Sequence, residues 1–197
     1  MASWRDLPGP ARTIGSAVTA AVDAARDGDR DAFVAAAADV AALPSEQAGI
    51  VLGAVVRALL EAQHPDGLDG DDIQVVLARC YAGAIAWLPV GSVDVHPLIA
   101  VLASALGIHE PGVTYQEITG PPEPSRGDDW AGDPDVASIG AAATVDETAV
   151  RPPTPAEYAW HAPLLIADLL VATGRPLNRY LDGAFAEIVR SETMEMP

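Results

Sequence analysis

The sequence predicts an all-α protein, an antiparallel bundle of about seven helices with a long acidic Pro/Gly-rich loop before the last two helices. Half of the 197 residues are apolar, which excludes wholesale disorder. Much of this apolar share is alanine, the strongest helix former, whereas aromatic residues make up only 5%. Two segments, 73–88 and 177–189, keep apolar side chains at three- and four-residue spacing over several turns, which is the pattern of an amphipathic helix.

The first three helices are bounded by strong local signals. The first is expected over residues 11–26 and stops at Gly28, because glycine readily takes the left-handed conformation that ends a helix. Asp29 or Asp31 is expected to cap the second helix. The third runs over residues 45–63, and its apolar positions cover so wide an arc that we expect it near the centre of the bundle.

The fourth helix has the clearest pattern in the chain, and a fifth follows it closely. Asp69, Asp71 and Asp72 supply the cap and a negatively charged first turn for the fourth helix. The fifth helix follows Asp94 and ends at about Gly107. Because the connections are only a few residues long, consecutive helices are expected to lie antiparallel. The apolar stripe of the fourth helix comprises Ile73, Val76, Leu77, Cys80, Tyr81, Ala84, Ile85 and Leu88.

Residues 112–153 differ in character from the rest of the chain. Proline, glycine and acidic residues are dense there and helical periodicity is lost, which predicts a long loop or arm. Trp130 is the expected anchor of this arm on the bundle, and a brief extended piece is expected at residues 113–118. Loops of this length are typically lids, binding arms or linkers.

Two further helices are predicted after the arm. Thr154 and Glu157 have the spacing of a capping box, with Pro155 at the first helical position and Gly174 as the stop. The last helix begins at Pro176. We therefore expect a single helical domain over 1–197, with a five-helix core at 11–107 and two C-terminal helices at 154–190 that dock on it.

The net charge and the composition indicate which partners are unfavourable and where in the cell the protein is expected. Twenty-eight acidic and 11 basic residues, all of the latter arginine, give a net charge of −17, which repels nucleic acid and anionic membrane surfaces. The first ten residues lack the apolar run of a signal peptide, and no apolar stretch reaches the roughly 20 residues of a membrane span. A cytoplasmic location is therefore expected. The single cysteine, Cys80, lies on an apolar stripe and is interpreted as a packing residue.

The strongest candidate for a chemical site lies on the helix after the arm. Glu157, His161, Asp168 and Arg175 follow one another at spacings of four, seven and seven residues, which places them near one helix face. A histidine with carboxylates can support acid–base chemistry or bind a metal ion. The histidine stands alone, however, and metal sites commonly use two histidines or a specific His-Glu pair. No metal and no cofactor is therefore predicted, and a polar face with ordinary intrahelical pairs is the favoured interpretation.

The other polar clusters are weaker candidates. Residues 27–31 carry alternating aspartates, as calcium loops do, but the required glycine and glutamate positions hold Ala32 and Ala38. A second acidic turn at residues 66–72 is interpreted as helix capping, with a weak surface cation as the alternative. Each of the three remaining histidines lies beside a carboxylate, and a shared metal site between helix ends is the minor alternative. They are His64, His96 and His109.

Two functional hypotheses remain open. The first is a protein-interaction or regulatory module that self-associates, with a homodimer expected, because the mean hydropathy is positive (+0.19) despite the high charge. The second is a small metal- or acid–base-dependent enzyme, built around His161 with Glu157 or Asp168, in which the arm acts as a lid. The second hypothesis requires another ionisable group to converge on His161 from a neighbouring helix.

Overall fold

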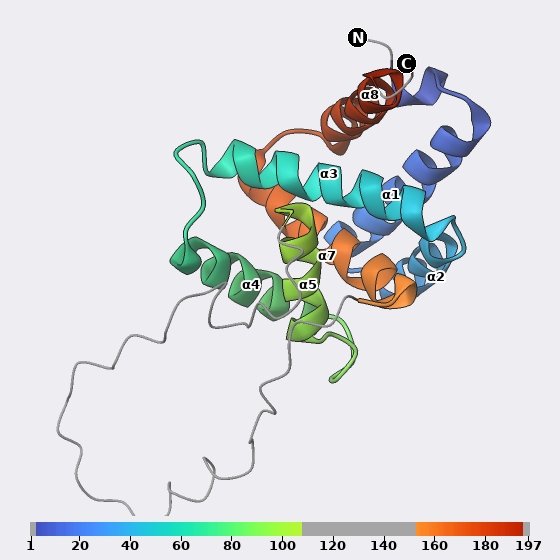
Figure 1. Cartoon of the computed structure of the whole chain (residues 1–197). Coiled ribbons are helices and arrows are strands. Elements are labelled where there is room, and N and C mark those ends of the chain that lie inside the picture. Colours follow the sequence, from blue (N-terminus) through green and yellow to red (C-terminus); the bar gives the residue numbers. More distant parts are fainter. Residues whose placement is uncertain (1–2, 108–152, 195–197) are drawn as a thin grey trace, which may run out of the picture.

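The computed structural model describes residues 3–107 and 153–194, with side chains described as far as Arg190. Within these ranges it contains seven α-helices, one short 3-10 helix and no strand, so the predicted all-α fold is confirmed (Figure 1). The arm predicted at 112–153, with Trp130 and the 113–118 piece, lies outside the described residues except for Pro153. The helices are η1 (Trp4–Asp6), α1 (Gly9–Asp27), α2 (Arg30–Ala41), α3 (Ser45–Gln63), α4 (Gly70–Ile85), α5 (Val95–Ala105), α7 (Pro155–Thr173) and α8 (Leu177–Met194).

The caps predicted at the starts of α2, α4 and α7 are confirmed. The Asp29 carboxylate accepts a hydrogen bond from the Ala32 backbone N–H at 3.1 Å and so begins α2. Capping boxes begin α4, where Asp69 pairs with Asp72, and α7, where Thr154 pairs with Glu157. In each box both side chains accept from the other residue's backbone N–H, which satisfies two donors that a helix start leaves free.

Helix α7 occupies the centre of the fold. It packs against α1, α2, α3, α4 and α5, which surround it in Figure 1. The sequence favoured residues 45–63 for this position, but α3 leaves Ile50 51% exposed. Residues 161–167 of α7, by contrast, are buried without interruption. A helix that is apolar all round is stable only in the interior, so α7 lies inside and α3 lies over it.

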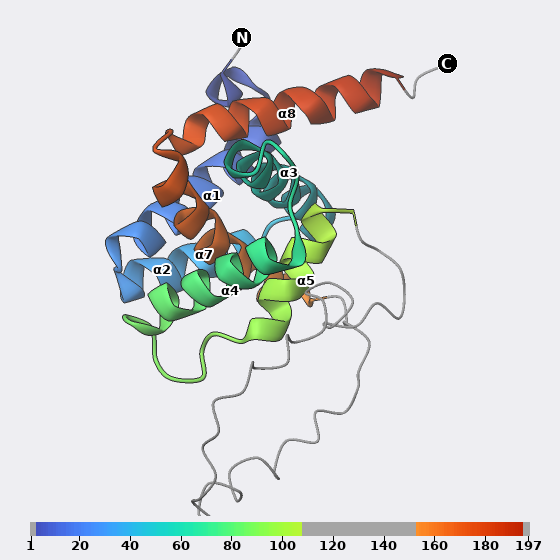
Figure 2. The ribbon, with the colours of Figure 1, turned by 90° about the vertical axis from the view of Figure 1, so that its left-hand side faces the viewer.

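The two ends of the described chain meet at α8. The Trp4 backbone N–H donates to the Asp182 carboxylate at 2.7 Å, and its indole N–H donates to Asn178 Oδ1 at 3.4 Å. The Trp4 ring lies against Gly15 of α1, where no Cβ stands in its way. Figure 2 shows η1 beside α8 at one end of the molecule. The N-terminal segment thus ties α1 to α8.

One hydrophobic cluster runs through all seven α-helices of the described ranges. None of these helices combines the length and the apolar character needed to cross a membrane.

Candidate functional site

His161, the centre of the predicted site, is a buried side chain with only 5% exposure. Its Nδ1 lies 2.8 Å from the Glu157 carbonyl oxygen one turn earlier in α7. Its Nε2 accepts a hydrogen bond from the backbone N–H of Asp94, at the start of α5, at 3.2 Å. Because Nε2 accepts, the proton is assigned to Nδ1 and the ring is neutral. Both ring nitrogens are therefore bonded to backbone groups.

Burial lowers the pKa of His161, although the carbonyl of Glu157 and the carboxylates of Asp94 and Glu157 act in the opposite direction. Removing an imidazolium from water is costly, which favours the neutral ring. His161 thus holds the start of α5 against α7 as an uncharged acceptor.

The two carboxylates predicted to accompany His161 take separate positions. The Glu157 carboxylate accepts from the Thr154 backbone N–H at 2.7 Å as part of the capping box. Asp168 faces α4, where Arg79 Nε lies 3.0 and 2.9 Å from its two oxygens and Arg79 Nη2 lies 2.8 Å from one of them. The structure therefore brings Glu157 near His161 but directs Asp168 to another helix.

The two other described histidines, His64 and His96, face different carboxylates. His64 Nδ1 lies 3.3 Å from an Asp72 oxygen, and His96 Nδ1 lies 3.2 Å from an Asp94 oxygen. His109 is outside the described residues. Across the part of the chain that the structure describes, no three His, Cys, Asp or Glu side chains gather as a metal ion would need.

Cys80 is 2% exposed on the inner face of α4. Burial, with a smaller contribution from the charge of Asp168, raises the pKa of its thiol to about 12. A thiol reacts as a nucleophile only through its thiolate. Cys80 is therefore a packing residue, as the sequence indicated.

A pocket of about 390 Å³ opens where the C-terminal ends of α3 and α7 meet α4 and the start of α8. We call it the α3–α4–α7 pocket. Two of the chain's 11 arginines line it together with one carboxylate, so it is less acidic than the chain as a whole. Its polar lining consists of Gln63, His64, Asp72, Arg79, Thr173, Arg175 and Tyr180.

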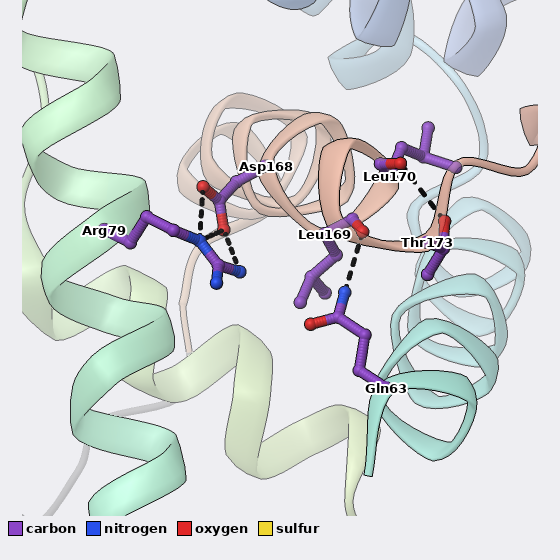
Figure 3. Close-up of polar contacts among 6 residues, drawn as sticks. All are labelled: Gln63, Arg79, Asp168, Leu169, Leu170 and Thr173. Atoms are coloured by element: carbon purple, nitrogen blue, oxygen red, sulfur yellow. Dashed lines mark hydrogen bonds and ion pairs between the residues drawn. The ribbon is translucent and has the colours of Figure 1, made fainter.

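Two residues that line the pocket, Gln63 and Thr173, form hydrogen bonds with the last turns of α7 (Figure 3). Gln63 at the end of α3 donates from Nε2 to the Leu169 carbonyl at 2.7 Å. The Thr173 hydroxyl donates to the Leu170 carbonyl at 3.1 Å. The Leu170 carbonyl also accepts from the Gly174 backbone N–H at 3.2 Å, so the Thr173 hydroxyl adds a second hydrogen bond to it. The end of α7 is thereby fixed against α3.

Sequence reasoning did not find this pocket. Of its polar residues, only Arg175 had been associated with the candidate helix face. Gln63, Arg79 and Tyr180 belong to three different helices and are far apart in the chain. No spacing rule connects such residues, so the sequence carried no signal for the pocket.

The outer face of α4 carries exposed apolar side chains that no other described helix covers. Val75, Ala78, Ala82 and Ile85 are all exposed, with Val75 at 60% and Ile85 at 43%. Their spacing of three, four and three residues puts them on one line, on the side of α4 opposite its buried residues. We call these four residues the α4 seam.

Comparisons of the chain with protein-family models, with curated proteins and with solved structures found no match.

Proposed function

We propose that this chain is a non-enzymatic interaction module that forms a homodimer through the α4 seam. The observation that carries this proposal is the exposed apolar line of Val75, Ala78, Ala82 and Ile85. Apolar residues at alternating three- and four-residue spacing are the pattern by which one helix packs against another. On an exposed helix they favour a partner helix over water.

The seam is self-complementary when two copies of α4 meet antiparallel about a two-fold axis that passes between Ala78 and Ala82, on the side of the helix opposite the buried Cys80. In that arrangement Val75 of one copy faces Ile85 of the other, and Ala78 faces Ala82. The small side chains at the centre permit close approach of the helix backbones, while the larger ones fill the space at each end. A two-fold contact uses the same surface on both copies and closes at the dimer. A second copy of the chain is therefore the partner that we assign to this face.

The bonding of the chemistry-bearing side chains supports a non-enzymatic role. Both nitrogens of His161 are bonded to backbone groups, and Asp168 is bound by Arg79. An acid–base group acts when it can exchange a proton with a substrate within hydrogen-bond reach.

A cytoplasmic location agrees with a reduced, buried Cys80. The net charge of −17 disfavours nucleic acid and anionic membranes as partners.

The test compares two exposed alanines in helices. Ala82→Glu places a negative charge at the centre of the proposed two-fold contact, whereas Ala35→Glu makes the same change on the exposed side of α2. Glutamate is a good helix former, so both variants are expected to fold. Native mass spectrometry and light scattering coupled to size exclusion should report a dimer for the wild type and Ala35→Glu, and a monomer for Ala82→Glu.

A wild-type chain that remains monomeric at its highest soluble concentration would contradict the proposal. A dimer that persists in Ala82→Glu would also contradict it, because the contact would then lie elsewhere. Circular dichroism of both variants confirms that any change in mass reflects assembly rather than unfolding.

A further inference from the structure

The α3–α4–α7 pocket contains an arginine that makes no ion pair or hydrogen bond with the described residues. Arg175 follows Gly174 at the end of α7 and lines the pocket. Asp72, the carboxylate that lines the pocket, and Asp168, the carboxylate paired with Arg79, are already engaged. Asp72 accepts from the Asp69 backbone N–H at 3.2 Å and faces His64, and Asp168 is held by Arg79. The guanidinium of Arg175 is therefore available to an anion from outside.

Arg79 presents a second guanidinium in a fixed orientation. Its bonds to Asp168 use Nε and Nη2 along one edge of the group, as Figure 3 shows. Nη1 takes no part in them. A guanidinium carries five N–H donors in a plane, so one edge can bind a protein carboxylate while the other remains for a ligand. Asp168 thus acts as a positioning residue for Arg79.

Tyr180 supplies an unsatisfied polar group at the same place. The residue lines the pocket and is only 6% exposed. Its hydroxyl is buried and has no hydrogen-bond partner among the described residues. A buried polar group without a partner is costly, so folded proteins usually supply one from the chain, from water or from a bound ion or ligand. The orphaned hydroxyl of Tyr180, the exposed guanidinium of Arg175 and Nη1 of Arg79 are each able to donate to an acceptor.

We infer that the α3–α4–α7 pocket binds a small organic acid through its carboxylate groups, with Arg79, Arg175 and Tyr180 as donors. The planar carboxylate matches the fork of a guanidinium. A volume of about 390 Å³ lies at the lower end of the range of small-molecule sites. The pocket shares Val75 of α4 with the α4 seam, but Arg175 and Tyr180 lie outside α4, and all three donors belong to one copy of the chain.

The test is isothermal titration of the full chain with succinate, citrate and inorganic phosphate at constant ionic strength. We expect saturable binding of succinate or citrate. Arg175→Gln should weaken that binding about tenfold or more, as loss of a charged hydrogen-bond donor does. Arg30→Gln, a matched change at an exposed arginine of α2, should leave it unchanged.

Tyr180→Phe provides a second variant that keeps the aromatic packing. It should weaken succinate or citrate binding while the thermal stability of the unliganded chain is retained, because the hydroxyl has no partner to lose among the described residues. Equal affinity in wild type and Arg175→Gln, or no saturable binding of either carboxylate, would overturn the inference. Tighter binding of phosphate than of both carboxylates would overturn the assignment of ligand class.

The same titration in Ile85→Glu separates this inference from the proposed homodimer, because Ile85 belongs to the α4 seam, does not line the pocket and lies six residues from Arg79. Wild-type affinity in that variant would show that the pocket works in a single copy of the chain. Loss of binding there, with the fold intact, would contradict a site formed within one chain.

Discussion

At the scale of single residues, His161 illustrates how a side chain suited to catalysis is used for structure. Its neutral ring accepts the backbone N–H of Asp94, which lies 67 positions earlier in the chain. The sequence identified the histidine because its spacing from Glu157 and Asp168 is visible on one helix. Its actual partner is a backbone group on a distant element, and no local pattern reports such a group.

His161 should make stability depend on pH in mildly acidic solution. Its pKa is lower in the folded chain than the usual value of about 6.5 in the unfolded one. Below pH 6.5 the unfolded chain therefore binds a proton that the native chain excludes, and the free energy of unfolding falls, by up to about 1.4 kcal/mol per pH unit. Urea unfolding between pH 7.5 and 5 measures this slope.

His161→Gln should flatten the slope in that pH range, because glutamine does not titrate. His96→Gln serves as the matched control, because it removes a histidine side chain that is 76% exposed and keeps His161. A slope that survives in His161→Gln would assign the pH dependence to another group.

Gly15 shows that packing can reverse the effect of helix propensity. Alanine in place of glycine inside a helix normally adds about 0.5–1 kcal/mol of stability. At Gly15 of α1, however, a methyl group would overlap the buried Trp4 ring, and overpacking costs about 1–3 kcal/mol. We expect Gly15→Ala to lower the free energy of unfolding by about 1 kcal/mol in urea titrations.

Gly183→Ala in α8 is the matched control, because nothing lies within 4 Å of the added methyl group. That variant should be more stable than the wild type. Stabilisation by Gly15→Ala would mean that Trp4 moves aside without cost.

At the scale of elements, the helix ends were predictable and the helix positions were not. Caps such as Asp29 and Thr154 act on backbone groups only three residues away, so the sequence contains all of their signal. The central position of α7 depends on contacts with five other helices. The Arg79–Asp168 pair joins residues 89 positions apart. Packing partners of this kind follow from tertiary structure, which periodicity within one segment does not specify.

The capping box of α7 should contribute measurably to stability. Thr154→Ala removes the hydroxyl that accepts from the Glu157 backbone N–H at 3.2 Å. Loss of a threonine cap costs about 1 kcal/mol, and we expect that decrease in the free energy of unfolding. Thr13→Ala in α1 is the control. The Thr13 hydroxyl donates to the Gly9 carbonyl of the same helix at 3.0 Å and caps no backbone N–H. An equal effect of both changes would argue against a capping contribution.

At the scale of the whole molecule, the net charge of −17 opposes the homodimer that we propose, while the apolar α4 seam favours it. These two contributions respond differently to salt. Ions screen repulsion between separated surface charges, over about 10 Å at 0.1 M and 3 Å at 1 M. Burial of apolar side chains depends much less on ionic strength. Salt should therefore strengthen the dimer.

Analytical ultracentrifugation between about 0.05 and 0.5 M NaCl should show the dimer dissociation constant falling as salt rises, with Ala82→Glu monomeric throughout. Carboxylate binding in the α3–α4–α7 pocket should respond in the opposite direction, because screening weakens the attraction of Arg175 for an anion. A dimer that dissociates as salt rises would indicate an interface built on ion pairs. Such a result would show that the dimer interface lies outside the α4 seam, because the four side chains of the seam carry no charge.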